Sequence, residues 1–162
     1  MFENIIHSTI GGLHTLASLG ALVFGTMIFL KTKGTATHKR LGYLYVFCMY
    51  FLNISSFFIS NFGGFSIFHG FAIFSILTVT GAMVPTIRRK NGWIYFHYYF
   101  MNWSVVGLYS ALCAEIGTRF VGSMQQFWWV VALASGLTAL IGGLVIHTQA
   151  KKINLHSWMS SS

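Results

Sequence analysis

The chain has 162 residues, of which 55% are hydrophobic, 17% aromatic and only 7% charged, with 10 Lys and Arg against 2 Asp and Glu. Soluble domains carry about a quarter charged residues because their surface must be hydrated, so this composition excludes a soluble enzyme and a disordered chain. The net charge of +8 does not indicate a nucleic-acid partner either, because the basic residues mark loops instead of covering one face.

Runs of apolar residues predict five transmembrane helices. Each run is long enough as a helix to cross a hydrocarbon core of roughly 30 Å. In chain order the runs are Ile5 to Leu30, Leu41 to Ser60, Phe65 to Ile87, Trp93 to Ile116, and Gln126 to Ala150. We therefore expect an all-α helical bundle in the lipid bilayer. It forms one domain over residues 1–153, followed by a short cytoplasmic tail over 154–162.

Polar and small residues recur at helical spacing along the first three runs. The first run carries His7, Gly11, His14, Ser18 and Gly25 on one stripe, and its small residues let a neighbouring helix approach closely. The second run offers Met49, Asn53, Ser56 and Ser60, and the third offers His69 with Thr80. We expect each of these helices to turn a polar edge inward.

The fourth and fifth runs add further ionisable groups. His97 and Glu115 lie 18 residues apart in the fourth run, which is about five whole turns, so both fall on one face. His147 lies near the end of the fifth run, just before Lys151 and Lys152.

The basic residues set the predicted orientation. Nine of the ten lie in the connection after the first run, in the connection after the third run, and after the fifth run. By the positive-inside rule these segments face the cytoplasm, so the N-terminus lies outside.

Counting along the helices places His14 and His69 at similar heights in the outer half and Glu115 somewhat further out. Side chains lean toward the N-terminus of their helix, which is outward for the two imidazoles and inward for the carboxylate, so the three can converge in one layer. Two imidazoles and a carboxylate are ligands typical of a transition metal such as zinc, copper or iron, with one position left for water or substrate. We interpret these three residues as a metal site, with Glu115 as third ligand or proton acceptor. His7 is a further candidate ligand at the rim.

Other readings of the same residues stay open. His97 and His147 form an inner histidine layer, and two layers of imidazoles are typical of a b-type cytochrome with haems near each membrane face. Alternatively, the polar side chains only hold helices together in a non-enzymatic subunit or assembly factor. A homo-oligomer or a larger membrane complex is compatible with each reading.

Four short motifs resemble the family called domain of unknown function 2306, which comprises small bacterial inner-membrane proteins. They are Leu13-His14 through Gly25, His38-Lys39-Arg40-Leu41-Gly42 with Tyr45, Phe68-His69 followed by Arg88-Arg89, and His97-x-x-x-Met101-x-x-Ser104 with Ala111 and Arg119. Tyr43 and Trp103 stand where the family pattern leads us to expect basic residues. The resemblance covers roughly Leu13 to Arg119. It implies a multi-pass protein of the bacterial cytoplasmic membrane and no particular reaction.

Overall fold

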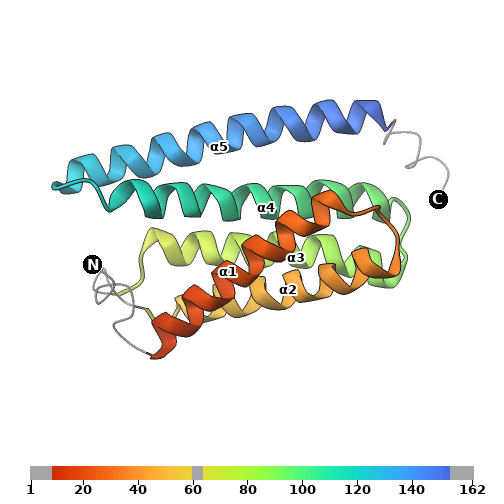
Figure 1. Cartoon of the computed structure of the whole chain (residues 1–162), viewed down its shortest axis with the longest axis horizontal. Helices are drawn as coiled ribbons and strands as arrows, with labels where there is room; N and C mark the ends of the chain where they lie inside the picture. Colours follow the sequence, from red (N-terminus) through yellow and green to blue (C-terminus); the bar gives the residue numbers. More distant parts are fainter. Residues whose placement is uncertain (1–8, 60–63, 154–162) are drawn as a thin grey trace. The chain divides into compact units, whose positions relative to one another are not determined.

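The computed structural model describes residues 9–59 and 64–153, which form five helices and no strand. The helices are α1 (Thr9–Leu30), α2 (Ala36–Ser56), α3 (Ile67–Arg88), α4 (Trp93–Thr118) and α5 (Met124–Lys152) (Figure 1). The all-α prediction is confirmed, and each helix corresponds to one predicted run.

Three of the helices, α1, α3 and α5, are long and apolar enough to cross a membrane. The other two contain more polar residues near their first turns. α2 begins with the sequence Ala-Thr-His-Lys-Arg, and the first half of α4 is rich in Tyr and Trp and contains His97 and Asn102. Five helices are therefore established, and five membrane spans remain a prediction.

Short capping motifs fix where two of these helices begin. The Thr35 side chain precedes α2 and accepts a hydrogen bond from the His38 backbone N–H at 3.2 Å. The Ser123 side chain does the same for the Gln126 N–H at the start of α5, at 3.2 Å. These oxygens satisfy backbone donors that a helix start leaves without an intrahelical partner.

The chain divides into two compact units, Met1–Leu77 and Thr78–Ser162, and the division falls within α3. In unit 1, α1 packs against α2, around the buried side chains of Ala21, Tyr45 and Met49. Gly20 allows this approach, because a Cβ atom there would lie 3.0 Å from the Cys48 Sγ. Gly20 is not part of the small-residue stripe predicted for the first run, but Gly25 of that stripe is buried.

In unit 2, α5 lies along α4 (Figure 1). Buried side chains of this unit include Val79, Leu108, Val131 and Ile146. Outside this core, large apolar side chains are exposed along α5, among them Leu133, Leu137, Leu140 and Leu144 at 57–61% exposure. Such a surface is unfavourable in water and favourable against lipid.

Candidate functional site

The His14 imidazole on α1 is hydrogen-bonded to α2. Its Nδ1 lies 3.0 Å from the Ser55 Oγ, and the Ser55 hydroxyl donates to the Leu52 carbonyl at 3.0 Å. Because the hydroxyl has only one hydrogen, its oxygen accepts from the His14 Nδ1–H. The neutral ring therefore carries its lone pair on Nε2.

His69 is held differently, in the first turn of α3. Its Nδ1 accepts a hydrogen bond from the Ser66 backbone N–H at 2.9 Å and lies 3.0 Å from the Ser66 Oγ. The ring is only 7% exposed and lies between Phe65 and Phe57, with ring centroids 5.2 and 5.5 Å away. Since a backbone N–H donates to Nδ1, the neutral ring carries its hydrogen on Nε2. His69 thus acts here as a capping residue.

Both imidazoles contact the C-terminal end of α2. His14 bonds to Ser55, and His69 packs against Phe57, the residue that follows α2. Unit 1 therefore brings together, at one end, two of the histidines that the sequence assigns to one layer.

Asn53 adds a polar link near the same end. Its side-chain amide donates to the Met49 carbonyl at 2.6 Å and to the Ser75 Oγ at 3.0 Å, and Asn53 is only 7% exposed. The prediction that Asn53 points inward is confirmed. This bond joins α2 to α3 within unit 1.

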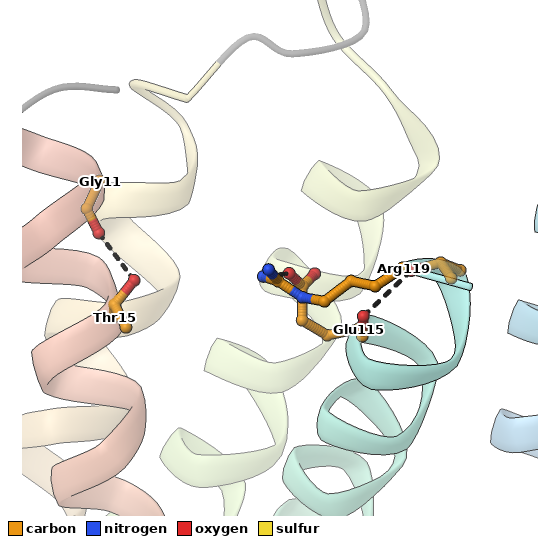
Figure 2. Close-up of polar contacts among 5 residues, drawn as sticks. Gly11, Thr15, Glu115 and Arg119 are labelled. Carbon is orange, nitrogen blue, oxygen red and sulfur yellow. Dashed lines mark hydrogen bonds and ion pairs between the residues drawn. The ribbon is translucent and has the colours of Figure 1, made fainter. Parts of the chain in front are cut away.

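Glu115 belongs to unit 2 and forms an ion pair with Arg119, the residue that follows α4 (Figure 2). The Glu115 side chain is 65% exposed and that of Arg119 is 43% exposed. Exposed pairs of this kind contribute between about 0 and 1 kcal/mol in water. The role of Glu115 as third ligand or proton acceptor remains a prediction.

Within residues 9–59 and 64–153, no group of three His, Cys, Asp or Glu side chains forms an arrangement that could hold a metal ion. His7, the fourth candidate ligand, lies outside the described residues. The metal site of His14, His69 and Glu115 therefore stays a prediction. The structure supports it only in that both histidines contact the C-terminal end of α2.

The inner-layer candidate His97 has surroundings similar to those of His14. Its Nδ1 lies 3.1 Å from the Thr86 Oγ1 on α3, and that hydroxyl donates to the Ala82 carbonyl at 2.7 Å. His97 therefore donates from Nδ1 and carries its lone pair on Nε2. His147 on α5 is exposed. The haem role of this pair is untested.

Ser55, Ser66 and Thr86 position the histidines and were missed by the sequence interpretation. The role of Ser66 could have been predicted from the sequence. Ser66 is followed three residues later by His69, whose side chain can accept a hydrogen bond, and this spacing resembles a capping box. Ser55 adjoins Ser56, and helical periodicity alone does not decide which of two adjacent hydroxyls faces a neighbour.

Lys33, in the connection between α1 and α2, and His38, in the first turn of α2, form a pair of neighbouring basic residues. Burial lowers the pKa of Lys33. Burial, and then the neighbouring Lys33 charge, lowers the pKa of His38. The neutral imidazole of His38 is therefore favoured.

Comparison with known proteins gives one family. A family model described as "Predicted membrane protein (DUF2306)" matches residues 11–150. Comparisons with curated proteins and with solved structures gave no match.

Proposed function

Because the chain belongs to the DUF2306 family of predicted membrane proteins, we propose that it is a five-span protein of the bacterial cytoplasmic membrane with its N-terminus outside. The basic residues on alternate connections support this orientation. The 21 residues of α2 extend about 31 Å at 1.5 Å per residue, which is long enough for a span. The polar residues near the starts of α2 and α4 then lie at the inner interface.

We further propose that the outer end of unit 1 binds a transition metal or haem through the His14 Nε2. The observation that carries this proposal is the His14–Ser55 bond. A ligating histidine almost always donates its other ring N–H to a fixed acceptor, which sets the tautomer and the ring orientation. Ser55 is such an acceptor, because its own hydrogen is committed to the Leu52 carbonyl.

His69 is the neighbouring candidate for a second ligand, and it fits less well. Its Nδ1 is occupied by the Ser66 N–H, so ligation through Nε2 requires the ring to change tautomer and give up that bond. Such a bond contributes about 1 kcal/mol, a cost that ligation would have to exceed. The proposal therefore rests on His14 first.

Titrating purified protein in detergent with Co²⁺ and, separately, with haemin tests the site. We expect one equivalent of one of these probes to bind the wild type and not His14→Ala. Ser55→Ala is expected to bind about tenfold more weakly, because the ligand is present but its orientation is lost. Thr26→Ala is the matched control, since it removes another α1 hydroxyl, one that donates to the Leu22 carbonyl of the same helix. Equal affinity in wild type and His14→Ala would exclude the site.

The redox alternative is a b-type cytochrome or electron-transfer subunit that uses both histidine layers. The His97–Thr86 contact favours it, because it sets the same tautomer as in His14. A reduced-minus-oxidised absorption spectrum tests this reading. The expected result is a haem signal that His97→Ala diminishes, and the lack of any Soret band would exclude it.

The third reading, a non-enzymatic subunit or assembly factor, is favoured by the His69 cap and by the Asn53–Ser75 bond. Both contacts stabilise the fold without any ligand. In this case substitution of His14 or Glu115 changes only protein stability, and a larger partner co-purifies with the chain.

A further inference from the structure

The turn between α3 and α4 holds an arginine at a position that usually requires glycine. α3 ends at Arg88, and the Lys90 N–H bonds back to the Pro85 carbonyl at 3.1 Å. This bond closes the helix end as in a Schellman motif, and Arg89 occupies the left-handed position within it, with φ of 49°. Glycine adopts this conformation without steric cost, whereas a side chain does so at a cost in free energy.

The Arg89 side chain reaches the first residue of α4. Its guanidinium carbon lies 4.6 Å from the centroid of the Trp93 ring, which is a cation–π contact. A guanidinium over an aromatic ring still has N–H donors in its own plane, and their fork matches the oxygens of a phosphate. Tryptophan in turn prefers the headgroup level of a bilayer.

Five exposed cations gather at this end of unit 2. The Tyr98 hydroxyl donates to the Ile146 carbonyl at 2.9 Å, so the start of α4 lies beside the end of α5. The cations are Arg88, Arg89, Lys90, Lys151 and Lys152. Glu115 is the only acidic residue of the described part of the chain, and it pairs with Arg119 near the opposite end of α4. Charge complementarity therefore calls for an external anion.

Exposed apolar side chains adjoin these cations. Ile87 is 64% exposed and Ile153 is 50% exposed, and each is next in sequence to a basic residue. A phospholipid could contact both groups of side chains, because its phosphate would pair with the cations while its acyl chains would cover the isoleucines.

We propose that the α3–α4 turn, with Arg89 held on Trp93, binds the phosphodiester headgroup of an anionic phospholipid in the inner leaflet. Lys151 and Lys152 add to the attraction from the end of α5. This inference rests on the membrane placement proposed above and not on the imidazole site. A failure here therefore leaves the metal or haem proposal unaffected.

Native mass spectrometry of the full chain in neutral detergent, titrated with phosphatidylglycerol, tests the site. We expect phosphatidylglycerol to bind more tightly than phosphatidylcholine. Arg89→Gln should weaken its binding about fivefold, the factor that corresponds to one juxtamembrane cation. Arg89→Gly should weaken binding equally while leaving the helix end intact, because glycine fits the left-handed position. It therefore separates loss of the side chain from misfolding.

Lys31→Gln is the matched control, since it removes one exposed cation from the predicted inner face of unit 1. It is expected to leave phosphatidylglycerol binding nearly unchanged. Equal weakening by Lys31→Gln and Arg89→Gln would overturn the proposal in favour of diffuse charge attraction. If inorganic phosphate alone competes away the lipid at equal concentration, the site is one for soluble phosphate and the assignment to lipid is wrong.

Discussion

At the scale of single residues, histidines with different partners carry different chemistry. His14 and His97 each donate to a hydroxyl that is itself bonded to a backbone carbonyl, whereas His69 accepts from a backbone N–H. The first arrangement leaves Nε2 as the basic nitrogen, and the second makes it the donor. This distinction depends on Ser55, Ser66 and Thr86, and it separates a candidate ligand from a capping residue.

The His69 cap predicts a graded effect of substitution. His69→Ala leaves the Ser66 N–H without its acceptor at the start of α3 and should lower the free energy of unfolding by about 1 kcal/mol. His69→Gln should retain most of the stability, because Gln at this position reaches back to the same N–H. Thermal unfolding in detergent, followed by circular dichroism, measures both variants. Identical losses in the two would show that the imidazole contributes something other than the cap.

His38 predicts a dependence of stability on pH. Its pKa lies below the ordinary value of 6.5, because burial and the Lys33 charge disfavour the charged ring. The unfolded chain therefore binds a proton more readily than the folded chain. The stability from this residue is present above pH 6.5 and is lost as the pH falls toward the lower folded pKa.

The measurement is the midpoint of thermal unfolding across this pH range. We expect His38→Gln to reduce the fall in stability on acidification. If His38→Gln and the wild type show the same dependence of the unfolding midpoint on pH, His38 is not the source of that dependence.

At the scale of helices, the sequence predicted the number of elements better than their ends. The hydropathy pattern predicts that the second helix begins at Leu41, after the charged residues, but α2 begins at Ala36 after the Thr35 cap. A cap is decided by local hydrogen bonds and not by hydropathy. The i, i+4 spacing of Glu115 and Arg119 is typical of an ion pair on a helix, and the structure shows this pair. No periodicity reports which tautomer a histidine adopts.

Close packing of α4 against α5 depends on Gly142. A Cβ atom there would lie 2.8 Å from the Val106 Cγ1 and closer still to Cγ2. Gly142→Ala should therefore lower the free energy of unfolding by about 1–3 kcal/mol, the usual cost of overpacking. Denaturation by SDS measures this change.

Two further variants make this prediction specific. Gly136→Ala is the control within the same helix, because a Cβ atom there meets nothing within 4 Å. The double variant Val106→Ala/Gly142→Ala should recover stability relative to Gly142→Ala, since it removes the two obstructing methyl groups. Equal losses from Gly136→Ala and Gly142→Ala would indicate a helix effect common to both positions instead of a close approach.

At the scale of the whole molecule, composition, exposed apolar surface and family membership agree on the membrane. The family model covers residues 11–150, which includes nearly all of the five helices. Hydropathy alone supports three spans. The proposal of five spans with the N-terminus outside rests on the basic residues in alternate connections.

Cysteine labelling tests that topology. In a background of Cys48→Ala and Cys113→Ala, a membrane-impermeant maleimide applied to spheroplasts should label Gly122→Cys. It should label Asn91→Cys only after permeabilisation, because the proposed topology places the α3–α4 connection inside. Labelling of both positions in sealed spheroplasts would contradict a five-span arrangement with this orientation.

The central claim is that the histidines at the end of unit 1 bind a transition metal or haem in the native protein. The most direct measurement combines an absorption spectrum with elemental analysis of protein purified from its membrane without added ligand. The account predicts metal or haem in near-stoichiometric amount in the wild type and a loss of it in His14→Ala. Near-zero content in both proteins, each folded by circular dichroism, would contradict the claim.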